Sequence, residues 1–315
     1  MKPRIVFFGT GPVSLACLEG IYDVFDVEAI ITKPSRMAPS GREHAHPVRD
    51  WAKEHSIPIH QVTGKSALQE LVAGAKFSAK VGLVVDFGMI IPAAVIDSFP
   101  RGIINSHFSL LPLLRGADPI TFAILEGHDY TGVSLMRIVP ALDEGELIAQ
   151  ERYRLPADTT TPALTRELGD ISNQLLREYL PKYITGDINP WPQPVDTQRP
   201  TYTRKLTKRD GTVDWHKPAV QLEREVRAFI GWPGSRTQLF GREITLTTAR
   251  VADGSGLDTD GRAALSSAKP GEPIRSWPDR LLVATGEEAL EILQLKPAGK
   301  REMAVADFLR GLPTP

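Results

Sequence analysis

The stretch Arg-Ile-Val-Phe-Phe-Gly-Thr-Gly-Pro-Val at residues 4–13 decides the fold of the first part of the chain. Its apolar run predicts a short buried strand, residues 9–12 predict a tight turn, and Val13 begins a segment with helical periodicity. A strand that leads through a tight turn into a helix is typical of an open parallel sheet with helices on its faces. We therefore expect a Rossmann-like α/β domain at the start of the chain.

The alternation of strands and helices continues beyond this opening unit. Further strands are predicted at 27–32, 80–85, 103–107, 133–139 and 148–154, and further helices at 48–55, 119–126 and 161–180. The composition then changes, because residues 186–200 contain four prolines, which favour a semi-rigid extended linker. Beyond it, one helix and several short strands separated by turns predict a small OB-like β-barrel. The expected organisation is a catalytic domain at 1–185, a linker at 186–203 and a barrel domain at 204–315.

The glycine turn at residues 9–12 stands where a dinucleotide-binding fingerprint would lie, but the match is incomplete. Ser14 occupies the place of the third glycine, and residues 31–34, at the end of the next strand, offer no carboxylate for a ribose hydroxyl. A tight turn that needs small residues explains the pattern better. We expect no NAD site.

The composition narrows the class of protein. The chain has 315 residues, 42% of them hydrophobic, and a net charge of −1. Cys17 is the only cysteine, which excludes disulfide frameworks and CxxC sites. No apolar run has the length of a signal-peptide core or a membrane span, so we expect a cytoplasmic protein with no membrane partner. Residues 1–195 hold 18 basic against 22 acidic residues and the rest 19 against 16, so an anionic partner would suit the second part.

The run Asn-Ser-His-Phe-Ser-Leu-Leu-Pro-Leu-Leu-Arg-Gly-Ala-Asp-Pro at 105–119 holds the candidate chemistry. The period of two in a strand places Asn105 and His107 on the same face, and Asp143 follows in Leu-Asp-Glu-Gly. An amide can donate to an oxyanion, an imidazole can carry a proton near neutral pH, and a carboxylate can orient the imidazole. Taken singly, each residue also fits a structural role, such as a turn or a satisfied core histidine.

The combination of motifs resembles the 10-formyltetrahydrofolate-dependent formyltransferases. Similar motifs are Asn-x-His-x-Ser-Leu-Leu-Pro, Arg-Gly-Ala-x-Pro-Ile, Thr-Gly-Val-Ser at 131–134 and Leu-Asp-x-Gly at 142–145. The resemblance implies that Asn105, His107 and Asp143 are catalytic. It also implies that 10-formyltetrahydrofolate is the formyl donor, while the single cysteine and the lack of a ligand cluster in the sequence predict that no metal takes part. The folate site implied by the resemblance comprises Ser109, Leu110, Leu111, Pro112, Phe87, Met89, Ile90 and Ile91.

Three segments of the second half resemble the C-terminal domain of the tRNA-directed members of this family. They are residues 207–215, 226–234 and 295–303. The acceptor implied is the α-amino group of methionyl-initiator tRNA, bound at its acceptor stem by a monomeric enzyme. The tRNA contacts implied or suggested by clustered positive charge are Arg42, Arg204, Lys205, Lys208 and Arg209. The alternative is a formyltransferase acting on a small amine, such as a nucleotide-linked amino sugar.

The chain departs from the family pattern at several positions near the site. Asp86-Phe87 stands where the family more often has a small residue and Tyr, Leu113-Leu114 replaces a basic-aromatic pair, and Asp118 replaces a small residue. The catalytic triplet keeps the family's residue types. The loop at 34–47 has His44 and His46 where the family usually has lysines, and two histidines alone predict no metal site.

Overall fold

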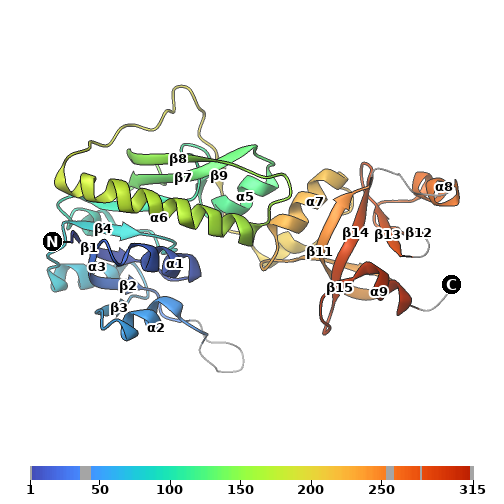
Figure 1. Cartoon of the computed structure of the whole chain (residues 1–315), viewed down its shortest axis with the longest axis horizontal. Helices are drawn as coiled ribbons and strands as arrows, with labels where there is room; N and C mark the ends of the chain where they lie inside the picture. Colours follow the sequence, from blue (N-terminus) through green and yellow to red (C-terminus); the bar gives the residue numbers. More distant parts are fainter. Residues whose placement is uncertain (1, 36–43, 253–258, 277–278, 313–315) are drawn as a thin grey trace. The chain divides into compact units, whose positions relative to one another are not determined.

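The chain forms two units in a computed structural model that describes residues 2–35, 44–252, 259–276 and 279–312 (Figure 1). The first unit comprises residues 1–119, 130–155 and 165–203, and the second comprises 120–129, 156–164 and 204–315. The predicted catalytic domain, residues 1–185, included the segments 120–129 and 156–164, whereas in the structure these segments group with the second unit. The reason for 156–164 is that its polar groups bind α7 (Ala219–Ala228): Thr161 Oγ1 donates to Ala228 O at 2.7 Å, and Arg227 donates to Thr159 O at 2.8 Å.

A seven-stranded sheet forms the centre of the first unit. In spatial order its strands are β3 (Ile59–Gln61), β2 (Asp26–Thr32), β1 (Arg4–Phe8), β4 (Val81–Val84), β5 (Ile103–His107), β7 (Tyr130–Arg137) and β8 (Leu147–Arg154). The first five strands are parallel, and β7 and β8 run antiparallel to their neighbours. The expected Rossmann-like class is confirmed, with a mixed rather than fully parallel sheet. The strand order changes direction between β1 and β4, and ligands of such sheets bind at the carboxyl ends of strands beside that point.

Helices and a short ladder complete the first unit. The helices are α1 (Pro12–Ile21), α2 (Pro47–Glu54), α3 (Lys65–Ala75), α4 (Ala93–Ile96) and most of α6 (Thr161–Thr185). The helix α6 runs alongside α1 and the sheet, since the Ser172 hydroxyl lies 2.7 Å from that of Ser106 and 3.7 Å from the Cys17 sulfur (Figure 1). Strands β6 (Arg115–Gly116) and β9 (Tyr202–Thr203) pair in parallel. Because β9 and the backbone of Trp191 are bonded to the first unit, the Pro-rich segment is not a free linker.

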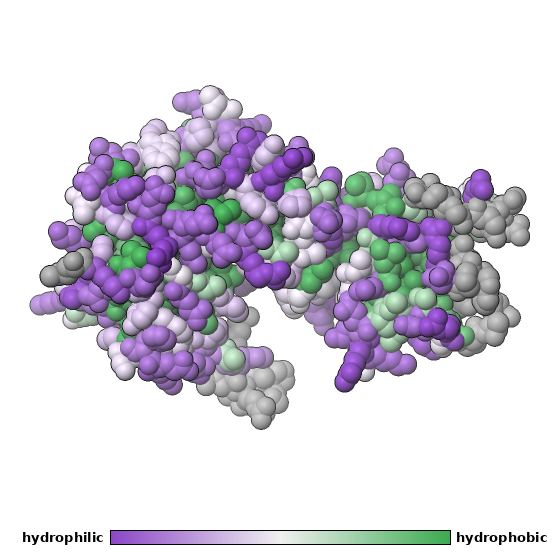
Figure 2. Space-filling model, viewed as in Figure 1, coloured by the Kyte–Doolittle hydropathy of each residue, from purple (hydrophilic) through white to green (hydrophobic). Residues whose placement is uncertain are grey.

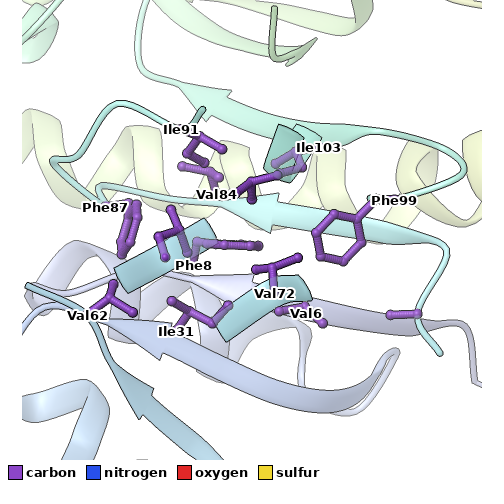
Figure 3. Close-up of a cluster of buried hydrophobic side chains, with 13 residues drawn as sticks. Val6, Phe8, Ile31, Val62, Val72, Val84, Phe87, Ile91, Phe99 and Ile103 are labelled. Carbon is purple, nitrogen blue, oxygen red and sulfur yellow. The ribbon is translucent and has the colours of Figure 1, made fainter. Parts of the chain in front are cut away.

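A cluster of buried apolar side chains lies on one face of the parallel strands (Figure 3). Phe8 of β1 packs edge-on against Phe87 and Phe99, with ring centroids 5.7 Å and 6.1 Å apart. The strand β4 is buried at every position, as expected for a central strand covered on both faces. Burial of each such aromatic side chain contributes about 1.5–3 kcal/mol, so this cluster fixes the strand ends that carry the site.

The second unit is built on an antiparallel sheet, which confirms the expected small β domain. Its strands, in spatial order, are β10 (Ser235–Leu239), β11 (Arg242–Val251), β14 (Ala289–Pro297), β13 (Arg280–Ala284) and β12 (Pro273–Ser276), with β15 (Met303–Ala304) beside β14. Its helical segments are α7, η1 (Lys208–Gly211), α8 (Thr259–Ser267), α9 (Val305–Arg310) and nearly all of α5 (Pro119–Leu125). Apolar residues of α7 and α9 share one buried cluster with the sheet.

The face of the molecule shown in Figure 2 carries mostly hydrophilic side chains with hydrophobic ones scattered among them. Within the described ranges, no helix combines the length and the apolar character that a membrane crossing requires.

Candidate active site

The strand β5 presents two polar side chains toward one face of the sheet and a third toward the other. Asn105 and His107 share a face, whereas Ser106 between them points to α6 and bonds with Ser172. Alternation of side chains along a strand produces this division. The predicted pairing of Asn105 and His107 on one face is therefore present at the carboxyl end of β5.

His107 is buried, with 5% of its surface exposed, and both ring nitrogens face oxygen atoms. Nε2 lies 3.0 Å from the carbonyl oxygen of Leu114, and Nδ1 lies 3.7 Å from Asp143 Oδ2. A carbonyl oxygen only accepts hydrogen bonds, so Nε2 carries the proton of the neutral ring. Nδ1 is then the nitrogen that can accept a proton, and the carboxylate beside it would stabilise the resulting charge.

Asp143 lies in the loop between β7 and β8 and has a left-handed backbone conformation, with φ of 50°. Its Oδ2 atom accepts a hydrogen bond from the Gly116 N–H at 2.7 Å and faces His107. The structure thus brings Asp143 and His107 together across a separation of 36 residues in the sequence. Leu114 and Gly116, whose backbone groups hold this pair, were not among the predicted site residues. The only sequence signal for them is the Arg-Gly step that follows the Leu-Leu-Pro run.

Asn105 is half-buried, and its side-chain amide has no hydrogen-bond partner within the part of the chain that the structure describes. Its donor is therefore available to an oxygen atom of a bound molecule. A preorganised amide that binds developing negative charge is the main element of an oxyanion site. The geometry supports transfer of an acyl-type carbon, in which an oxyanion and a proton are handled by neighbouring groups.

The glycine turn after β1 is filled by protein groups. The Ser14 hydroxyl accepts from the Thr10 N–H at 2.9 Å and donates to Val85 O at 2.6 Å. A Cβ atom added to Gly11 would lie 3.1 Å from a carboxyl oxygen of Asp86. A pyrophosphate at this turn would meet that carboxylate, whose repulsion disfavours a dinucleotide.

Asp86 follows β4 and belongs to a charged group at the carboxyl ends of the strands. Loss of hydration around its carboxyl group raises its pKa, the positive charge of Lys33 lowers it, and the negative charge of Asp118 raises it. The net direction is upward. Two of the residues that depart from the family pattern, Asp86 and Asp118, therefore interact with each other.

The residues predicted to bind folate fall into two groups. Met89 and Leu110 are half-buried and Ile90 is 64% exposed, so their side chains remain accessible to a ligand. Phe87, Ile91, Ser109 and Leu111 are buried. The Ser109 hydroxyl donates to Leu113 O at 2.6 Å, and Ser109 O accepts from Ser134, so Ser109 shapes the turn from within. Pro112 lies within that turn and is buried as well.

The structure describes four of the five residues predicted to bind tRNA. Arg42 lies outside the described residues. Arg204 is exposed and forms an ion pair with Asp210, which lowers the pKa of that carboxyl group, while Lys205, Lys208 and Arg209 are exposed. No cluster of three or more His, Cys, Asp and Glu side chains suited to a metal ion occurs among the residues that the structure describes.

Comparison with known proteins identifies the class of protein to which this chain belongs. Residues 4–180 match the model of the formyl transferase family, and residues 205–313 match that of the formyl transferase C-terminal domain. A methionyl-tRNA formyltransferase of Myxococcus xanthus is 36% identical over 98% of this chain and 95% of its own length. Another, from Roseiflexus sp., is 37% identical over 99% of this chain and 93% of its own length. The chain belongs to the methionyl-tRNA formyltransferase family.

A solved structure shares the fold at low sequence identity. The N-formyltransferase from Helicobacter canadensis, described in complex with folinic acid and dTDP-3-aminofucose, superposes with a TM-score of 0.66 at 14% identity. The match covers 96% of this chain and 100% of that one. The two proteins share their fold.

Proposed function

We propose that this protein transfers the formyl group of 10-formyltetrahydrofolate to the α-amino group of methionyl-initiator tRNA. The observation that carries the proposal is the convergence of Asn105, His107 and Asp143 at the carboxyl end of β5 in a chain of this family. We further propose that the enzyme acts as a monomer in the cytoplasm, where charged tRNA is available, and that no metal takes part.

In the proposed reaction the neutral α-amino group attacks the formyl carbon. A carbon–nitrogen bond forms, the formyl oxygen becomes an oxyanion, and the Asn105 amide donates to it. An oxyanion donor of this kind contributes about 2.7–4 kcal/mol to the stability of the transition state. The structure supports this role because the amide of Asn105 has no partner within the described residues.

The proton of the attacking amine passes to His107. The ring nitrogen that accepts it is Nδ1, since Nε2 donates to Leu114 O, and Asp143 stabilises the imidazolium that results. The oxyanion then collapses, the bond from the formyl carbon to N10 breaks, and the proton is delivered to N10, directly or through water. The distance of 3.7 Å between Nδ1 and Asp143 shortens when substrate binds, as is common at catalytic pairs.

The proposed folate site lies beside the point where the strand order changes direction. The segments after β4 and β5 supply accessible apolar side chains, Met89, Ile90 and Leu110, and backbone groups for the pterin ring. Phe87, Ile91 and Leu111 support these segments from the core. The basic residues at 204–209 contribute phosphate contacts for the tRNA.

The acceptor is tested by following the formyl group. The full chain is incubated with 10-formyltetrahydrofolate and methionyl-tRNA, with uncharged tRNA and a nucleotide-linked amino sugar as parallel acceptors. We expect formyl-methionine on the charged tRNA and no product on either control. Transfer to the amino sugar with none to the charged tRNA would replace the proposed acceptor by a small amine.

A further inference from the structure

The loop that carries Asp143 is held by a side chain from a distant part of the sequence. Gln193, which has 7% of its surface exposed, donates two hydrogen bonds through Nε2. The acceptors are the carbonyl oxygens of Asp143 at 2.7 Å and Gly145 at 2.9 Å. One side-chain amide therefore spans the backbone of the loop on both sides of Glu144.

The orientation of this amide is set by Arg115. The guanidinium of Arg115, 4% exposed, donates to Gln193 Oε1 at 2.7 Å. Because a guanidinium only donates, the oxygen of the amide must face Arg115 and the nitrogen must face the two carbonyls. The opposite orientation would place two donors together and leave two carbonyls facing an oxygen.

Arg115 is itself fixed to the same loop and to β9. Its guanidinium lies 3.0 Å from Glu144 Oε1 and donates to the Tyr202 hydroxyl at 3.2 Å. The next residue, Gly116, supplies the N–H that binds Asp143 Oδ2. Gln193 thus binds the backbone of the loop, Arg115 pairs with the Glu144 carboxylate, and Gly116 binds the Asp143 carboxylate.

We infer that Gln193, oriented by Arg115, is a positioning residue that holds Asp143 against His107. Asp143 has a positive φ, a conformation that a non-glycine residue keeps only when its surroundings enforce it. The two bonds from Gln193 enforce it by binding the carbonyls on both sides of the turn. Without them the carboxylate would move relative to His107 Nδ1, and displacements near 1 Å cost about 100-fold in rate. The kinetic consequence rests on the proposed function.

The first test replaces Gln193 in the full chain and measures steady-state formyl transfer. We expect Gln193→Leu to lower kcat by about 10- to 100-fold while KM for the folate changes less than about threefold. Gln193→Glu keeps an acceptor for Arg115 but cannot donate to the two carbonyls, so its kcat should fall by the same roughly 10- to 100-fold. This second variant keeps the test valid if Gln193→Leu folds poorly. Gln198→Leu, the same change five residues later, is the matched control and should retain the wild-type kcat.

A double-mutant cycle separates positioning from general damage. If Gln193 acts through Asp143, adding Gln193→Leu to Asp143→Ala should lower kcat by less than about twofold further. A merely structural role would slow both backgrounds alike. That result, or a wild-type kcat in both folded Gln193 variants, would overturn the inference.

Amide hydrogen exchange tests the same inference without any substrate. The Gly116 N–H reports its bond to Asp143 Oδ2. We expect its exchange to accelerate at least tenfold in Gln193→Glu and to stay unchanged in Gln198→Leu. An unchanged exchange rate in Gln193→Glu would contradict the positioning role of Gln193. If the wild type fails to formylate methionyl-tRNA while Gln193→Glu still accelerates exchange of the Gly116 N–H, the proposed function is wrong and the positioning role of Gln193 is retained.

Discussion

Gly116 connects backbone conformation to the chemistry of the site. Its φ of 103° lies in the region that favours glycine, and an added Cβ would lie 2.6 Å from Thr203 O in the partner strand β9. Its N–H binds the carboxylate of Asp143 at 2.7 Å. A side chain here would therefore strain the β6–β9 pair and shift the donor that holds Asp143.

We predict that Gly116→Ala destabilises the protein by about 1–3 kcal/mol and lowers kcat at least tenfold. The free energy of unfolding and the formyl-transfer rate measure the two effects. Gly102→Ala is the control, because Gly102 also has a positive φ, 71°, but no atom of the described residues beyond its chain neighbours lies within 4 Å of an added Cβ. It should lose stability and keep its kcat. A fully active Gly116→Ala would show that this donor does not position Asp143.

At the scale of single residues, strand periodicity predicted that Asn105 and His107 share a face, whereas the catalytic roles of these two residues and of Asp143 were implied by the resemblance to the formyltransferase family. Gln193 escaped prediction because its contact with Asp143 spans 50 residues and depends on how the Pro-rich segment folds back. The orientation of the His107 ring depends on the Leu114 carbonyl, which no residue type encodes.

The helix α7 illustrates what an element's periodicity reveals and what it omits. One helix was predicted in this part of the chain, and its residues Leu222 and Val226 are buried in the second unit's core. The same helix buries Glu225, whose carboxylate pairs with Lys217 Nζ at 2.5 Å. Burial raises the pKa of Glu225, and the charge of Lys217 lowers it, with the net direction upward.

We predict that Lys217→Met costs about 1–3 kcal/mol of unfolding free energy at pH 8, and less at pH 5. The sign follows from the pKa. A carboxyl group whose pKa is raised in the folded state makes folding most favourable when it is protonated, and that advantage is lost as the pH rises through the folded pKa. Removing Lys217 raises the folded pKa further and enlarges the loss. Urea unfolding at the two pH values measures it.

The exposed lysine at position 300 provides the control for this pair, since Lys300→Met should leave stability within about 0.5 kcal/mol at both pH values. If Lys217→Met were equally destabilising at pH 5 and pH 8, ionisation of Glu225 would not be the cause.

At the scale of elements, the prediction recovered most of the helices and strands of the first unit but missed others, including α3, which has 11 residues. The helix α3 and the strand β3 were not predicted, and β3 has only three residues, two of them half-buried. The direction of β7 and β8 also could not be read from their residues. Buried strands look alike in sequence whether they run parallel or antiparallel, and the direction is set by how the connections cross the sheet.

For the whole molecule, the proposed function assigns folate binding to the first unit and phosphate contacts with the tRNA to basic residues of the second. Lys205, Lys208 and Arg209 are exposed, while Arg204 forms an ion pair with Asp210. Contacts from such residues to phosphates release counterions, so they weaken as salt rises. None of these residues belongs to the proposed folate site.

We predict that KM for methionyl-tRNA rises steeply between about 50 and 200 mM salt, whereas KM for 10-formyltetrahydrofolate changes little. The double variant Lys208→Ala, Arg209→Ala should reduce the slope of log KM against log salt by roughly two, with kcat at saturating tRNA unchanged. A salt-independent KM for the tRNA would contradict the assignment of these residues to phosphate contacts.

The central claim, that the site on β5 transfers a formyl group to methionyl-tRNA through an oxyanion bound by Asn105, is tested most directly by one rate. The measurement is formyl transfer to methionyl-tRNA by the wild type and by Asn105→Ala, at saturating concentrations of both substrates. The account predicts that kcat falls by about 100- to 1,000-fold while both KM values stay within about threefold. A kcat within threefold of the wild type would contradict it.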